Sequence, residues 1–122
     1  MKKLILCIVS FVLHAGINAQ EVPKDMWIAQ MKTALPEHFC STEQYFRQCF
    51  NVQDSKCRTV AAEATSTCLN QFEKQIPNKL KQPADGTKWG AQIGMCAGNA
   101  YEAALSSQRI SNAKCNNPNN WR

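Results

Sequence analysis

The sequence has no apolar run that could span a membrane. A spanning helix needs about 20 apolar residues, and the longest run here, Leu4–Leu13, is only half that length. Lys2 and Lys3 precede the run and the small residue Ala19 follows it, an order that is typical of a secretion signal. We therefore predict that residues 1–19 are a cleaved signal. Residues 20–122 should then form an exported protein, periplasmic or secreted, without a transmembrane segment.

The sequence also lacks the motifs of common enzyme classes. There is no serine elbow, no His-Glu-x-x-His, no phosphate loop, no dinucleotide fingerprint and no calcium loop. His38 stands beside Glu37 and is the only histidine after residue 19, and a histidine next to a carboxylate can act as a general base. Because no nucleophile motif accompanies it, we interpret His38 as an exposed polar residue between helices. We predict a protein that is not an enzyme and needs no cofactor.

A strong excess of charge of one sign is absent as well. Removal of Lys2 and Lys3 lowers the formal net charge from +5 to +3, and the concentrated basic stripe that nucleic-acid binding requires is missing. One stretch, diluted by Glu73 and Asp85, gathers four lysines, which are Lys74, Lys79, Lys81 and Lys88. Such a group can hold an anionic surface, although a solvated loop is the simpler interpretation.

Cysteine, by contrast, is abundant. Cys7 lies in the predicted signal, which leaves six in the mature chain, namely Cys40, Cys49, Cys57, Cys68, Cys96 and Cys115. Six cysteines in a short exported chain are typical of three disulfide bonds. Free thiols or a metal cluster are disfavoured, because the sequence has no Cys-x-x-Cys pair and the mature chain keeps a single histidine. We expect no metal.

Strand patterns are nearly absent, whereas apolar residues recur at helical spacing in four segments. Pro36 should end the first segment, Ser41 and Gln44 have the spacing of a capping box for the second, and Asp54 should cap the third. The predicted helices span residues 24–35, 41–50, 55–76 and 87–107, with a loop over 77–87 and a polar tail. This pattern predicts an all-α fold, a small single-domain bundle of about four helices.

Helix geometry suggests how the cysteines pair. Cys57 and Cys68 lie on one predicted helix about 16 Å apart, beyond the ~7 Å that a disulfide allows between Cα atoms. Cys40 and Cys49 have a similar rise, about 13 Å, on the preceding helix. If those two helices form an antiparallel hairpin, the expected bonds are Cys40–Cys68, Cys49–Cys57 and Cys96–Cys115, one of about fifteen possible sets.

Three glycines interrupt the last predicted helix at a spacing of four, at Gly90, Gly94 and Gly98. Together they cost about 2.5–3 kcal/mol of helix propensity relative to alanine. Close approach of a neighbouring backbone or aromatic ring would offset this cost. We predict a packing groove within the core. The alternatives are a groove for a partner's side chain and insertion into a membrane.

Trp121, at the end of the polar tail, either covers the core or contacts a partner, since tryptophan is enriched at the centres of protein interfaces. Export, dense cross-linking and the missing catalytic motifs favour a non-enzymatic binding protein. We predict that a rigid helical surface acts on a protein partner, as an inhibitor or immunity-type protein. The alternative is a secreted factor that binds an anionic membrane or polymer through the Lys74–Lys88 region, with a role in virulence or colonisation.

Overall fold

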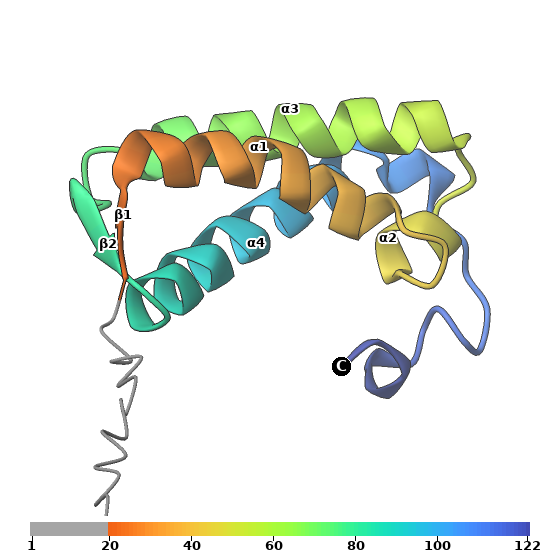
Figure 1. Ribbon diagram of the computed structural model, residues 1–122. Coiled ribbons are helices and arrows are strands. Elements are labelled where there is room, and N and C mark those ends of the chain that lie inside the picture. The colour runs from red at the N-terminus through yellow and green to blue at the C-terminus, as the bar shows by residue number, and fades with distance from the viewer. Residues whose placement is uncertain (1–19) are drawn as a thin grey trace, which may run out of the picture.

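A computed structural model describes residues 20–122, so the predicted signal at residues 1–19 lies outside the described residues. Four α-helices, two short strands and two turns of 3₁₀-helix make up this part of the chain (Figure 1). In chain order they are β1 (Glu21–Pro23), α1 (Lys24–Cys40), α2 (Tyr45–Gln48), α3 (Asp54–Phe72), β2 (Lys79–Lys81), α4 (Ala84–Ala104), η1 (Ser106–Gln108) and η2 (Pro118–Trp121). The predicted helical class and the three disulfides are confirmed.

Helices α1 and α4 both pack along α3. Its inward face carries small buried side chains, among them Ala61, Ala64 and Thr65, whose hydroxyl donates to the Ala61 carbonyl. Small side chains let the neighbouring helices approach closely. At the far end of α3, the ammonium of Lys24 donates to the carbonyls of Glu73 and Ile76. A cation at a helix C-terminus is favourable, so this contact fixes the start of α1 on the end of α3.

The end of the first helix differs from the prediction. Helix α1 continues through Pro36 to Cys40, although a proline inside a helix removes one backbone hydrogen bond and costs about 3 kcal/mol. The turn that follows carries Phe39 and Cys40, and both are buried. Their packing offsets the loss at Pro36. The capping box at Ser41 does not form, because α2 begins only at Tyr45 and the Gln44 amide donates to the Ser41 carbonyl.

A small antiparallel sheet replaces part of the predicted loop. In this sheet Val22 pairs with Leu80 and Glu21 pairs with Lys81. Leu80 is fully buried while the lysines on either side of it are exposed. A strand of three residues is too short to show alternation in a sequence, which explains why the pattern indicated only a loop.

All three predicted disulfide pairs are wrong. The bonds are Cys40–Cys57, Cys49–Cys115 and Cys68–Cys96, in place of Cys40–Cys68, Cys49–Cys57 and Cys96–Cys115. The error follows from Pro36. Helix α1 does not stop at that proline, so α1 forms the antiparallel pair with α3 in place of the predicted helix 41–50. The end of α1 then brings Cys40 to the first turn of α3, where Cys57 lies. Cys68, further along α3, then reaches α4, and Cys49 is left for the tail.

The glycines of α4 have different surroundings. A Cβ atom added to Gly98 would lie 3.0 Å from Cζ of Phe46, so glycine is what lets this ring settle on the helix. At Gly90 and Gly94 an added Cβ atom would meet nothing within 4 Å. Of the three predicted groove positions, Gly98 therefore packs closely against a neighbouring side chain of the described fold, and Gly90 and Gly94 do not.

This difference gives a matched pair of substitutions. Gly98→Val should lower the free energy of unfolding by about 1–3 kcal/mol, because its methyl groups overpack Phe46. Gly94→Val adds the same atoms in open space and should change stability by less than about 0.5 kcal/mol. Urea unfolding followed by circular dichroism measures both. Equal destabilisation by the two variants would contradict the contact with Phe46.

Candidate binding surface

Stacked aromatic rings hold α2 against the body of the protein. The rings of Phe39 and Phe46 stack with centroids 4.1 Å apart, and Tyr101 meets Phe46 edge to face at 5.2 Å. The buried hydroxyl of Tyr101 donates to the Phe46 carbonyl at 2.9 Å. Burial raises the pKa of Tyr101 to about 12. These contacts fix the short helix that carries Tyr45, which an isolated turn of four residues could not do alone.

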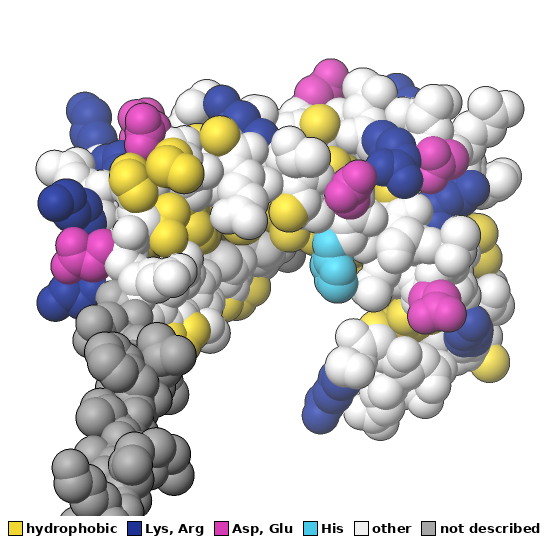
Figure 2. Space-filling model, in the orientation of Figure 1, with side chains coloured by type: hydrophobic (Ala, Val, Ile, Leu, Met, Phe, Trp, Pro, Cys, Tyr) yellow, Lys and Arg dark blue, Asp and Glu magenta, His cyan; other side chains and the backbone are white. Residues whose placement is uncertain are grey.

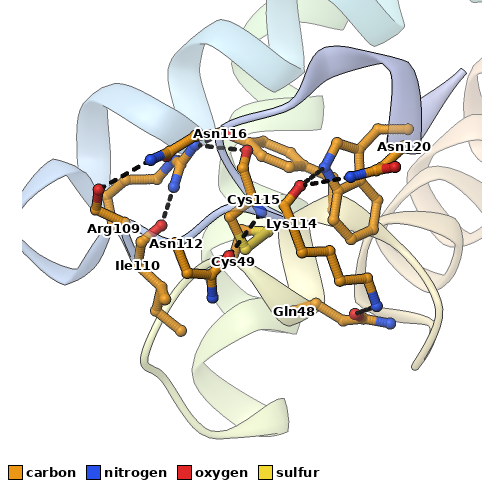
Figure 3. The surroundings of a disulfide bond; sticks show 12 residues. Gln48, Cys49, Arg109, Ile110, Asn112, Lys114, Cys115, Asn116 and Asn120 are labelled. Carbon is orange, nitrogen blue, oxygen red and sulfur yellow. Dashed lines mark hydrogen bonds between the residues drawn. A yellow bond between two sulfur atoms is a disulfide. The ribbon is translucent and has the colours of Figure 1, made fainter.

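The tail, residues 110–122, is fastened to the segment that follows α2. Phe50 and Arg109 form an isolated antiparallel bridge, and the Ile110 amide donates to the Cys49 carbonyl. The Cys49–Cys115 disulfide closes this region covalently (Figure 3). Within the tail, the Cys115 amide donates to the side chain of Asn112. A polar segment that would otherwise fray thus has a fixed path.

Arg109 joins α2 to the tail through all three nitrogen atoms of its guanidinium group. Nε donates to the Tyr45 hydroxyl at 2.9 Å, and the two terminal nitrogens donate to the carbonyls of Ile110 and Cys115 (Figure 3). The guanidinium also lies over the ring of Tyr45. Among the described residues no carboxylate forms an ion pair with Arg109. A partly buried positive charge therefore remains at this surface.

Tyr45 connects this cation to an acid. Its hydroxyl accepts from Arg109 and donates to Glu102 at 2.5 Å. Burial raises the pKa of Tyr45, the hydrogen bond to Glu102 raises it further, and Arg109 opposes the change. The phenol therefore stays protonated at neutral pH and relays the hydrogen bonds between α2, α4 and the tail.

Trp121 is partly buried at the outer edge of this network. Its indole nitrogen donates to the Lys114 carbonyl at 3.2 Å, and its ring meets Tyr45 edge to face at 5.7 Å. Lys114 places its ammonium 5.4 Å from the Trp121 ring centroid and donates to Gln48. The indole is thus held in place, and it packs on the edge of the core while one part stays accessible.

Two pockets meet at Trp121. The first, about 290 Å³, is lined by Tyr45, Arg109, Cys115, Asn116, Pro118 and Trp121, and we call it the arginine pocket. The second, about 350 Å³, is lined by His38, Glu43, Gln44, Asn120, Trp121 and Arg122, and we call it the tail cleft. The sequence singled out Trp121, but it gave no sign that Arg109 and Tyr45 would join it, because the pairing of Cys115 with Cys49 brings them together.

The predicted lysine surface lies at the other end of the molecule (Figure 1). Lys79 and Lys81 are exposed on one face of β2, Lys74 follows α3, and Lys88 places its ammonium over the ring of Trp89. Acidic groups lie among them, since Glu21 is paired in register with Lys81 and Asp85 accepts from the Lys81 amide. Dark blue and magenta side chains alternate at this end (Figure 2).

Residues 21–109 match the family described as T2SS substrate NttA. The chain belongs to this family. Membership of the NttA family, a family of type II secretion substrates by its description, implies export, as the sequence predicts. The match ends at Arg109, so it covers the helical body and not the tail. No curated protein and no solved structure matches the chain.

Two further findings concern membrane spans and metal sites. Among residues 20–122 no helix is long and apolar enough to cross a membrane. In the same residues no group of three or more histidine, cysteine or acidic side chains could hold a metal ion.

Arg109→Lys tests the attachment of the tail. Lysine keeps the charge but cannot donate to three separate acceptors in the geometry of guanidinium. Amide hydrogen exchange in residues 111–122 should become about tenfold faster, which corresponds to the ~1.4 kcal/mol of a weakened hydrogen-bond set. Arg58→Lys is the control, because Arg58 pairs with Asp54 on the exposed face of α3. Unchanged exchange in Arg109→Lys would show that the disulfide alone holds the tail.

The tyrosines give a prediction for alkaline pH. The chain has two tyrosines, and both have a pKa raised above 10.0. Above pH 10 the unfolded chain loses phenolic protons that the folded chain keeps, so the free energy of unfolding should fall as the pH rises towards about 12. Tyr101→Phe should reduce this dependence. Half-maximal phenolate absorbance at pH 10 in the folded protein would contradict it.

Proposed function

We propose that the exported protein is a non-enzymatic binding protein that acts on a protein partner through the arginine pocket. One observation carries this proposal: Tyr45, Arg109 and Trp121 line a single pocket. Tryptophan, tyrosine and arginine are the residue types that most often dominate the binding energy of protein interfaces. Pro118 and the Cys49–Cys115 bond complete a lining with little freedom to move.

Rigidity supports the same function. Binding costs less when the contact residues are already ordered. Here the Trp121 indole is hydrogen-bonded, Arg109 is held by three acceptors, and a disulfide fastens the segment between them. An inhibitor or immunity-type protein, which must engage one partner surface without rearranging, is the role that fits this construction. The partner should present a hydrogen-bond-accepting group to Arg109, which among the described residues is linked to a carboxylate, that of Glu102, through the Tyr45 hydroxyl.

The second candidate function is binding of an anionic membrane or polymer through the lysines. Lys79 and Lys81 share an exposed face of β2, which favours it. Glu21 and Asp85 beside Lys81 weaken it. Binding through exposed lysines should also fall steeply between low and physiological salt, whereas contacts made by a desolvated aromatic pocket should not.

Site-specific photo-crosslinking tests the proposal. A photoreactive residue at Asn119, exposed in η2 beside the pocket, should capture a defined protein from the native envelope or culture medium. The same residue at Glu63, exposed on α3, should not. Trp121→Ala should abolish the product from Asn119 because it removes the wall of the pocket, and Lys79→Glu with Lys81→Glu should leave it unchanged. The reverse pattern, loss with the lysine changes alone, would favour the second candidate.

A further inference from the structure

The tail cleft shares Trp121 with the arginine pocket and differs from it in every other lining residue. One wall is the end of α1 and the connection that follows it, with His38, Glu43 and Gln44; the other wall is η2 and Arg122. Figure 2 shows this hollow between the body and the tail, with a histidine at its upper edge. Its volume of about 350 Å³ is within the range of small-ligand sites, roughly 300–1,000 Å³.

The polar groups of this cleft are free to bind a ligand. Within residues 20–122, the side chains of His38, Glu43, Gln44 and Arg122 take part in no hydrogen bond or ion pair. Asn120 uses one amide hydrogen on the Lys114 carbonyl, which leaves its side-chain oxygen to accept. The cleft therefore offers both donors and acceptors on two facing walls.

The charged side chains that line the cleft are one acid and one base. Glu43 supplies one negative charge and Arg122 one positive charge. An anionic ligand would meet Glu43, and a cationic ligand would meet Arg122. One of the six lining residues is a large apolar group, so the cleft does not suit an apolar side chain either. These properties favour a neutral ligand with many hydroxyl groups.

The indole of Trp121 adds a flat apolar surface to this polar set. Its nitrogen is bonded to the Lys114 carbonyl, and the Lys114 ammonium and the Tyr45 ring also contact the indole. The part of the ring that lines the cleft therefore offers the ligand carbon surface. Tryptophan combines such a surface with a fixed orientation. A pyranose ring has a matching shape, with C–H groups on one face and hydroxyls, each both donor and acceptor, around its rim. We propose that the tail cleft binds a neutral oligosaccharide, with Trp121 under a sugar ring and Glu43, Gln44 and Asn120 bonded to its hydroxyls.

This activity goes beyond the proposed protein binding, because Trp121 is the single residue that lines both pockets. Soluble neutral trisaccharides test it directly: cellotriose, chitotriose, maltotriose and mannotriose, each titrated into the ¹⁵N-labelled mature protein. At least one should shift the Trp121 indole signal and the amide signals of Gln44 and Asn120 saturably, with a Kd of about 1 mM, as is common for weak small-ligand sites.

Variants separate the two sites. Gln44→Ala should weaken the trisaccharide at least about tenfold while the Asn119 cross-link to the protein partner persists. Asn116→Ala, on the arginine pocket and outside η2, should leave trisaccharide binding unchanged. Trp121→Phe keeps a ring and should weaken binding less than Trp121→Ala, with retained amide dispersion showing that both are folded. The proposal fails if no trisaccharide shifts Trp121, if a sulfated oligosaccharide alone does so, or if Gln44→Ala binds as the wild type.

Discussion

Two disulfides join α3 to its two neighbouring helices, one to α1 and one to α4, and the rest of the structure depends on them. Cys57 holds the end of α1, and Cys68 holds the middle of α4. A small chain buries too little apolar surface to be secure without cross-links, and each closed loop here contributes about 3–4 kcal/mol by the chain-entropy account. The bonds also set distance. They tie α1 and α4 to fixed positions on α3, at Cys57 and Cys68.

The tail depends on this body in a fixed order. Helices α1 and α4 position Phe39, Gly98 and Tyr101; these hold Phe46 and hence α2; and α2 presents Tyr45 and Cys49 to the tail. In the tail itself, Cys115 is buried and Ile110 and Trp121 are partly buried against the core. A segment with so few buried apolar contacts has low local stability, so the Cys49–Cys115 bond and Arg109 supply the order that packing does not. The pockets at Trp121 are therefore consequences of cross-linking.

The helical class, the export of the chain and the participation of six cysteines could be predicted, because periodicity, a signal pattern and cysteine number are local or additive features. The pairing could not. It depended on whether the helix ended at Pro36. That is decided by the burial of Phe39 against Phe46 and Tyr101 and by the bond of Cys40 to Cys57, which are tertiary effects. The glycines show the same limit, since the same spacing gives contact with Phe46 at Gly98 and open space at Gly94. The contacts of Trp121 could not be predicted for a related reason. They depend on the bond between Cys49 and Cys115, which are 66 residues apart in the sequence.

The two ends of the molecule act as separate electrostatic environments. Helix α3 has 19 residues, which at 1.5 Å per residue is about 28 Å, and the sheet with Lys79 and Lys81 lies at one end of it while the tail lies at the other (Figure 1). Exposed charges are screened over about 8 Å at physiological salt. The lysines therefore have little influence on a ligand at Trp121, and the character of each pocket there is set by its own groups. Arg109, linked to Glu102 through the Tyr45 hydroxyl, supplies donors to the arginine pocket, whereas the tail cleft is lined by the side chains of Glu43 and Arg122. One fixed tryptophan thus lines two surfaces of different chemistry on the same short tail.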